Sequence, residues 1–278
     1  MTHLENEPNA FSCRHQLANL YHACIAQMLS PLRRAGESEI FMMMGDGITY
    51  CGHPLLACFV GDYPEQVLIT ATFTGECPVC LISHDQLGAY NCNTPPGLRE
   101  LELVLQGLDF FDEDPAGFLQ ACKGSGIKPI INPFWKDLPY VHIYRSITPD
   151  VLHQLYQGIV KHVISWVTRA CGRAEIDVRC RRMPPNHNVR YFTKGISSLS
   201  HVTGQEHDQM CRILLGLVIN IPLAGGHSNV RLIRAVHAVL DFPYLAQYLV
   251  HTNETLEMLE DALARFHQVK DIFIDLGI

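Results

Sequence analysis

The chain has few of the features that would place it in a membrane or outside the cell. Its 278 residues contain no run of eighteen uninterrupted apolar residues, so we expect no membrane span. The first twelve residues are polar and acidic rather than basic and then apolar, so we expect no signal peptide. Only 18% of the residues are charged and 47% are hydrophobic, the balance of a globular protein, which excludes wholesale disorder.

Several common catalytic signatures are also missing. The sequence has no GxxxxGK[ST], no GxGxxG after a strand, no HExxH and no GxSxG. These absences remove the commonest kinds of ATPase, dehydrogenase, metalloprotease and serine hydrolase. Metal-dependent nucleic-acid chemistry and a non-catalytic, zinc-stabilised module remain.

Positive charge is scarce overall but concentrated in one segment. The formal net charge of −7 argues against a protein that coats nucleic acid through bulk charge. Residues 169–194 nevertheless hold seven cations against Glu175 and Asp177: Arg169, Arg173, Arg179, Arg181, Arg182, Arg190 and Lys194. This segment is the candidate phosphate-binding patch, although a solvated loop face explains it nearly as well.

Hydrophobic periodicity predicts an α-rich α/β chain. Residues 12–35 predict a helix that Pro31 bends or ends, and residues 39–44 and 48–61 predict strands around a Gly-Asp-Gly turn. Regular periodicity fades from about residue 75 to 144, apart from short helical pieces near 98–108 and 115–122. Thr148-Pro149-Asp150 predicts a helix start, with Thr148 as N-cap, and helices are expected over 148–170, 175–183, 198–221, 228–251 and 253–276. We therefore divide the chain into 12–74 (helix and strands), 75–147 (irregular insert) and 148–278 (helical remainder).

The stretch 55–80 is the most informative part of the sequence. Its first apolar run predicts a buried strand, which would place Asp62 at the carboxyl end, where open α/β sheets hold their chemistry. Two-metal phosphoryl transfer needs two or three carboxylates from separate segments, holding ions about 4 Å apart. Asp62 and Glu206 are candidates. Taken singly, each is explained as well by helix capping: Asp62 in a turn, and Glu206 in a first helical turn.

Cys77 and Cys80 have the two-residue gap that lets both thiolates bind one zinc ion. The other ligands would come from His84, Cys92, His142 or His153, and Asp150 lies three residues before His153, where it could orient the imidazole. Ordinary reduced thiols are the alternative. The eleven cysteines without a secretory signal favour a reduced state, and a redox CxxC is disfavoured because it should open a helix.

Long segments of the chain resemble the Plavaka-type transposases of fungal DNA transposons, in the Kyakuja–Dileera–Zisupton group. The resemblance covers nearly the whole chain, in order. Its segments are residues 20–36, 61–69 (GDYPEQVLI), 76–81 (ECPVCL), 130–166, 175–185, 189–210 and 240–278.

The resemblance implies a partial RNase H-like transposase core with a zinc-binding insert in 75–147 and a mostly helical C-terminal half. It implies DNA cutting and strand transfer with Mg²⁺, Asp62 and Glu206 as catalytic acids, and structural Zn²⁺ on Cys77, Cys80, His153 and His142. The implied partner is DNA at the transposon ends, bound by a homo-oligomer in the nucleus. The candidate DNA contacts are Arg179, Arg181, Arg182, Arg190 and Lys194.

One departure from the family bears on activity. The first catalytic aspartate of such proteins lies on the first strand, yet residues 1–12 contain no strand and no suitable aspartate. We therefore expect a transposase fragment with little or no strand-transfer activity, because an incomplete triad holds two metals poorly. A non-catalytic zinc-stabilised module that binds nucleic acid or protein is the alternative function.

Overall fold

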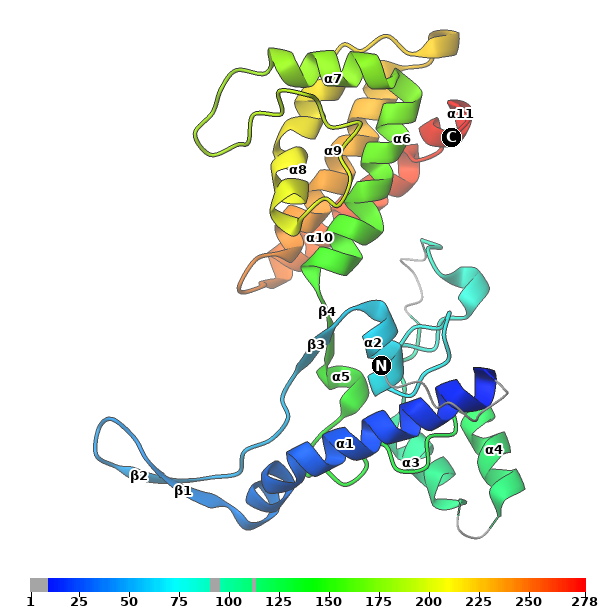
Figure 1. The fold of residues 1–278 in the computed structure, drawn as a ribbon, viewed down its shortest axis with the longest axis vertical. Helices are drawn as coiled ribbons and strands as arrows, with labels where there is room; N and C mark the ends of the chain where they lie inside the picture. The colour runs from blue at the N-terminus through cyan, green and yellow to red at the C-terminus, as the bar shows by residue number, and fades with distance from the viewer. Residues whose placement is uncertain (1–9, 91–95, 112–113) are drawn as a thin grey trace. The chain divides into compact units, whose positions relative to one another are not determined.

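The computed structural model describes residues 10–90, 96–111 and 114–278, and these form two compact units that meet between Pro149 and Asp150 (Figure 1). Each unit is described by itself. The architecture is α-rich with two small sheets, in agreement with the expected α-rich α/β class. The division at 12–74, 75–147 and 148–278 stays a prediction. No helix in the described ranges is long and apolar enough to cross a membrane.

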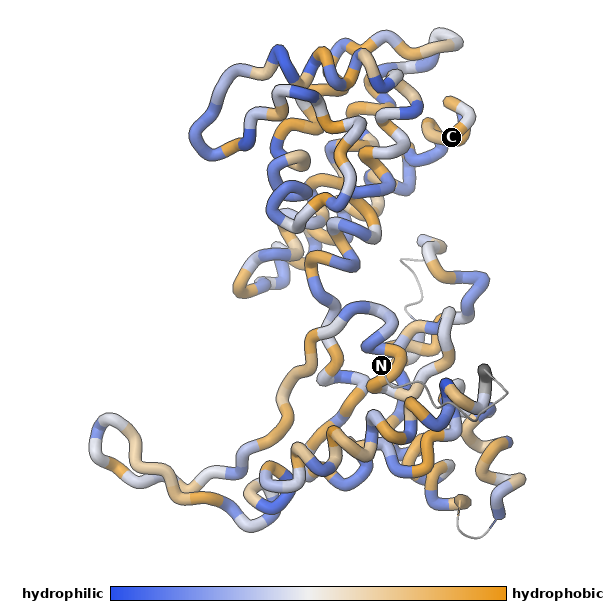
Figure 2. Tube along the Cα trace, viewed as in Figure 1, coloured by the Kyte–Doolittle hydropathy of each residue, from blue (hydrophilic) through white to orange (hydrophobic). Residues whose placement is uncertain are grey.

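The first unit opens with the long helix α1 (Ala10–Ser38), which runs through Pro31. Pro31 therefore does not end this helix, which continues three residues beyond the predicted end at residue 35. Hydrophobic and hydrophilic residues alternate along its turns (Figure 2), so α1 packs through one face. Two polar side chains fix that face: Asn19 accepts from the Ile131 N–H at 3.1 Å, and His22 bonds to the Leu68 carbonyl at 3.0 Å.

The predicted hairpin is confirmed, with β1 (Ile40–Met43) antiparallel to β2 (Thr49–Gly52) and Phe41 opposite Cys51. Asp46 builds the turn by accepting from the Ile48 N–H at 2.8 Å. Most side chains of both strands are exposed, including Phe41 at 73% and Met43 at 77%. The hairpin therefore extends away from the core of this unit.

A second, parallel pair joins β3 (Phe59–Gly61) to β4 (Ile147–Pro149), with Gly61 opposite Pro149. The predicted strand is thus present but shorter than the apolar run, and the expectation that it is buried is wrong, because Val60 is 59% exposed. The helix α2 (Tyr63–Ile69) follows β3 directly. Because the strands are parallel and β3 leads into a helix, their carboxyl ends share one edge of the sheet.

Between α2 and β4 lie η1 (His84–Gln86), α3 (Leu101–Asp109), α4 (Pro115–Gly124) and α5 (Ile143–Ser146), so both expected short helices of the insert are confirmed. They share a core with α2 that includes Ile69, Leu108, Phe118, Trp135 and Tyr144. Trp135 is 2% exposed and donates its indole N–H to the Ile69 carbonyl at 2.7 Å. The irregular segment is therefore packed as part of this unit.

The second unit is helical throughout its regular structure. The π-helix η2 (Val151–Val160) continues into α6 (Lys161–Cys171), followed by α7 (Arg173–Arg182), α8 (Gly204–Val218), η3 (Ala224–Gly226), α9 (Asn229–Ala246), α10 (Asn253–Val269) and α11 (Ile272–Asp275). The five predicted helices are all present with shifted ends. One core of α6, α8 and α9 side chains joins them, including Val163, Leu214 and Leu232.

The predicted helix start at Thr148 is wrong by two residues. Thr148 belongs to β4, and Asp150 caps the helix by accepting from the His153 N–H at 2.6 Å. The pairing of Thr148 with Val60 of β3 outweighs the local preference of Thr-Pro for a helix start. Val60 is far from Thr148 in the sequence, so the local pattern does not reveal this pairing.

Candidate functional site

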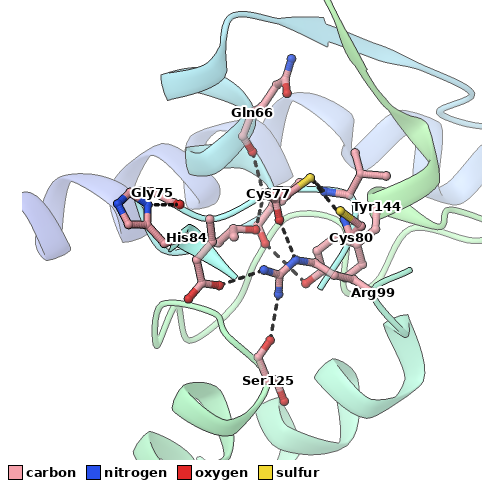
Figure 3. Close-up of polar contacts among 12 residues, drawn as sticks. Gln66, Gly75, Cys77, Cys80, His84, Arg99, Ser125 and Tyr144 are labelled. Carbon is pink, nitrogen blue, oxygen red and sulfur yellow. Dashed lines mark hydrogen bonds and ion pairs between the residues drawn. The ribbon is translucent and has the colours of Figure 1, made fainter. Parts of the chain in front are cut away.

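The two cysteines of the CxxC motif lie on one tight turn of the first unit (Figure 3). The Cys77 sulfur accepts the backbone N–H groups of Val79 and Cys80, both at 3.4 Å. Two N–H groups aimed at one sulfur stabilise a thiolate there, the form of cysteine that binds metals. This arrangement fits two of the four ligands of a tetrahedral zinc site.

A buried arginine holds this turn in place (Figure 3). Arg99 is 3% exposed and donates to the Cys77 carbonyl at 2.9 Å, the Ser125 carbonyl at 3.0 Å and the Glu76 carboxylate at 3.0 Å. These bonds tie the cysteine turn to the end of α4. Gly126 leaves room for them: its φ is +67°, and a Cβ there would lie 2.9 Å from the Glu76 carboxylate.

The other side of the turn is held by Tyr63 and His84. The Tyr63 hydroxyl donates to the Glu76 carbonyl at 3.0 Å and accepts from the Gly75 N–H at 2.7 Å. His84 Nδ1 lies 2.7 Å from the Gly75 carbonyl (Figure 3). Because a carbonyl can only accept, Nδ1 carries the proton in the neutral ring and Nε2 keeps its lone pair, the state in which histidine binds metals.

Burial raises the pKa of the Cys80 thiol, and the neighbouring Cys77 raises it further. The Ile82 backbone N–H and the Arg99 guanidinium act in the opposite direction. A bound cation would reverse the net effect, because a coordinated thiol loses its proton. Metal binding at this turn would therefore release the proton of the Cys80 thiol.

The remaining predicted zinc ligands are not gathered at this turn. His142 Nδ1 is buried without a hydrogen-bond partner among the described residues, and its ring meets Tyr144 edge-on at 6.3 Å. His153 belongs to the second unit, where Asp150 accepts from its backbone and contacts its Nδ1 at 3.1 Å, the orienting contact expected from their spacing. Cys92 lies outside the described residues. Within the described ranges no three metal-binding side chains lie together.

Asp62 directly follows β3, as predicted, and it caps α2 by accepting from the Glu65 N–H at 2.9 Å. The side chain of Glu65 folds back over the strand end. Its carboxylate lies so close to Gly61 that a Cβ on that glycine would be 2.9 Å away from it. Burial raises the pKa of Tyr21, and the negative charge of Glu65 raises it further. The structure thus brings two half-exposed carboxylates to the end of β3, a partner for Asp62 that the sequence analysis did not choose.

Glu206 lies in the second unit and forms a capping box with Thr203 at the start of α8. It also pairs with Arg190, so a predicted catalytic acid and a predicted DNA contact bind each other. Hydrogen bonds from Thr203, which outweigh burial, and the bond with Arg190 lower the pKa of this carboxyl. The geometry accounts for Glu206 as a capping residue and leaves its catalytic role a prediction.

The basic segment divides into two kinds of residue. Arg179 pairs with Glu175 at 2.7 Å and donates to the carbonyls of Leu217, Ile219 and Asn220, which it caps at the end of α8. Arg181, Arg182 and Lys194 are exposed. Arg190 is exposed as well and lies over the Phe192 ring at 5.3 Å.

Sequence reasoning also missed a cationic cavity of the second unit. Its wall includes Lys161, Arg169 and Arg173. The sequence contains a pattern that could have predicted this cavity. Lys161, Ser165 and Arg169 recur at intervals of four on one helix and so share a face. No comparable signal marked Arg99, whose partners lie far apart in the sequence.

A family model described as Plavaka transposase matches residues 1–167. A search of curated proteins and a search of solved structures found no match. The match includes β3, Asp62, the cysteine turn and β4, whereas Glu206 and the basic segment lie beyond it. It covers more than half of the chain and confirms the resemblance of the sequence to these proteins; the subgroup and the fungal source stay predictions. The chain belongs to the Plavaka transposase family.

Proposed function

We propose that this chain derives from a transposase that cuts and joins DNA by divalent-metal-dependent phosphoryl transfer, with Asp62 as a catalytic carboxylate. Its own strand transfer is expected to be weak or absent, because the acidic triad is incomplete. The observation that carries the proposal is the position of Asp62 and Glu65 at the end of β3, in a chain of a transposase family. In open α/β sheets the carboxyl ends of strands are the usual place for such residues. The parallel pair is the part of an RNase H-like core that we assign to this unit.

The two carboxylates provide oxygen donors of the type that Mg²⁺ and Mn²⁺ prefer. Asp62 uses one oxygen to cap α2, and that hydrogen bond fixes its rotamer toward the strand end. A metal ion bound there would activate the attacking water or 3′-hydroxyl and neutralise charge on the phosphate. Glu206 is proposed as the last acid of the set, released from Arg190 when DNA is bound.

Zinc is proposed as the structural metal of the cysteine turn. The N–H groups aimed at Cys77 and the lone pair on His84 Nε2 support Cys77, Cys80 and a histidine as ligands. His84 joins His142 and His153 as a candidate for that histidine. Bound zinc would cross-link the turn that Arg99 already holds against α4.

DNA contacts are proposed for the exposed cations Arg181, Arg182, Arg190 and Lys194. They surround the end of α7 and the loop after it, and their guanidinium and ammonium groups suit phosphate oxygens. Arg179 is excluded from this set, because its N–H groups are used inside the protein. A protein with this activity on chromosomal transposon ends would act in the nucleus.

The catalytic proposal is tested by Mn²⁺ binding to the purified chain, measured by electron paramagnetic resonance. Asp62→Asn removes one anionic ligand and should weaken Mn²⁺ binding by roughly tenfold or more. Asp109→Asn is the matched control, because Asp109 is an exposed carboxylate of the same unit that pairs with Lys136 at 2.9 Å. Equal Mn²⁺ binding by both variants and the parent would overturn the assignment of Asp62.

Nicking of supercoiled plasmid DNA in Mn²⁺ separates the two candidate functions. Nicking that Asp62→Asn abolishes and Asp109→Asn preserves would establish metal-dependent DNA cutting. The second candidate function is that of a zinc-stabilised binding module, and the cysteine turn is the observation that supports it. Plasmid binding without nicking, lost on removal of zinc, would establish that function and refute catalysis by this chain.

The zinc proposal has its own measurement, elemental analysis of the purified protein. We expect one zinc per chain, lost in Cys77→Ser/Cys80→Ser and retained in the control Cys24→Ser/Cys58→Ser, whose cysteines are exposed. Zinc retained by the first double variant would show that the metal binds elsewhere.

A further inference from the structure

The second unit contains a cavity of about 530 Å³ that the catalytic proposal does not use. One face of η2 and α6, the start of α7, the loop 196–202 and the start of α8 form its wall. Its volume lies within the range of small-molecule sites, about 300–1,000 Å³. Its polar lining includes Lys161, Arg169, Arg173, Ser197, His201 and His207.

The charge of this cavity is positive, in a chain whose net charge is −7. Lys161, Arg169 and Arg173 form no ion pair in the described part of the chain, and no acidic side chain lines the cavity. In contrast, Arg179, Arg190 and Arg212 of the same unit each pair with a carboxylate. Three exposed cations without counter-ions around one cavity give it a positive potential, which attracts an anionic ligand.

A carboxylate close to the loop 196–202 is already occupied. Asp177 accepts from the Ile196 N–H at 2.9 Å, the Ser197 N–H at 3.0 Å and the Ser197 hydroxyl at 2.5 Å. Although burial opposes it, these bonds, together with Arg181, lower the pKa of the Asp177 carboxyl. Asp177 therefore fixes the loop 196–202 and leaves the cavity cations unpaired.

The same loop includes an unusual backbone conformation. His201 has a φ of +54°, in the left-handed region that only a few per cent of non-glycine residues adopt, histidine more often than most. Such conformations persist where the surrounding structure imposes them, and they gather at binding sites. The bonds to Asp177 and the capping box at Thr203 hold the loop on both sides of His201.

His207 forms a buried polar point of the wall. It is 3% exposed, its ring stacks on Tyr156 with centroids 6.3 Å apart and planes at 6°, and its Nδ1 has no hydrogen-bond partner among the described residues. Burial, and then Lys161, lower its pKa, so the ring is neutral at physiological pH. A buried nitrogen without a partner destabilises the fold, and a hydrogen bond from a ligand would remove that cost.

The wall also has an apolar part, from Ile164, Ile196, Leu199, Val202 and Met210. A free inorganic anion would use only the cations and leave this surface in contact with water. A ligand that carries a phosphate and a flat apolar ring would use both.

We propose that this cavity binds a nucleotide, with its phosphate on Lys161, Arg169 and Arg173 and its base against the apolar wall and His207. The nucleotide is either free or the 5′-terminal nucleotide of a DNA strand, since the two share this chemistry. The site lies in the second unit and does not depend on Asp62.

The test is isothermal titration of the full chain with deoxynucleoside monophosphates, with a 5′-phosphorylated single-stranded oligonucleotide and with inorganic phosphate. Arg169→Gln/Arg173→Gln should weaken nucleotide binding by roughly tenfold or more, since each lost charge-assisted bond contributes about that much. Arg231→Gln/Arg234→Gln is the matched control, with equal charge removed from α9 outside the cavity. His207→Phe keeps the ring volume and removes the free nitrogen, so it should weaken monophosphate binding without weakening phosphate binding.

The three titrations distinguish a free nucleotide from the 5′-terminal nucleotide of a DNA strand. Monophosphate binding that the cavity variant loses and the control keeps supports a free nucleotide. Binding of the oligonucleotide alone, dependent on its 5′-phosphate and on Arg169 and Arg173, supports a strand end. Equal affinity for inorganic phosphate and monophosphates, or equal losses in both double variants, would overturn the proposal. Asp62→Asn should bind nucleotides like the parent, so failure of the catalytic proposal leaves this test intact.

Discussion

His22 should make the stability of the first unit sensitive to acid. Its ring is fully buried; Nε2 donates to the Leu68 carbonyl at 3.0 Å and Nδ1 accepts from the Phe134 N–H at 3.3 Å. Protonation would break the second bond, because a charged imidazole has no acceptor nitrogen. Burial, and to a smaller extent Lys128, lower the pKa of His22 from 6.5 to about 4, although the bond to Leu68 opposes them.

The sign of the effect follows from proton uptake. Between the two pKa values the unfolded chain takes up a proton that the folded unit refuses, so the free energy of unfolding falls as pH falls. The shift of about two and a half units corresponds to about 3 kcal/mol when the pH is below both values. Between about pH 7 and about pH 4.5 the loss should be about 2 kcal/mol.

The assay is urea unfolding at both pH values, followed by tryptophan fluorescence. The chain has two tryptophans, and a Trp166→Phe background leaves Trp135, whose indole is buried beside the His22 contacts, as the reporter of the first unit. In this background His22→Gln keeps a donor and an acceptor but cannot become charged, so its stability should change less on acidification by about 2 kcal/mol. His15→Gln is the matched control on the same helix, because His15 bonds locally to Asn19. An equal acid-induced loss in the parent and in His22→Gln would refute the reasoning.

Three further substitutions probe contacts that hold the two units, each measured by urea unfolding. Arg99→Lys keeps the charge but cannot reach the Cys77 and Ser125 carbonyls and Glu76 together, so the first unit should lose about 2 kcal/mol; an unchanged midpoint would contradict this. Gly195→Ala should lose more than Gly172→Ala by about 2 kcal/mol, because both have a φ of +85° but only at residue 195 would a Cβ collide with Asp177; equal losses would show that the Asp177 contact is dispensable. Arg179→Met should lose about 2 kcal/mol by uncapping α8, whereas Arg182→Met, exposed on the same helix, should lose little, and similar losses in both would exclude the capping role.

The sequence by itself determined the features that depend on neighbours in the chain. Periodicity located α8, α9 and α10, the Gly-Asp-Gly turn located the hairpin, and the apolar run before Asp62 located β3. Local spacing also found the cysteine turn and the contact between Asp150 and His153. These features need only a few consecutive residues, so their patterns can be recognised directly.

Only the tertiary structure decided how distant residues are used. Arg179 looked like a DNA contact and instead caps α8, because the carbonyls that it meets come from residues 217–220. Glu206, predicted to act with Asp62, caps α8 and pairs with Arg190, which lies sixteen residues before it, and its catalytic role stays a prediction. Thr148 joined a strand because β3 offered backbone partners from far along the chain. Buried groups must find partners wherever packing brings them, and no local pattern records which of several arginines or carboxylates will be taken.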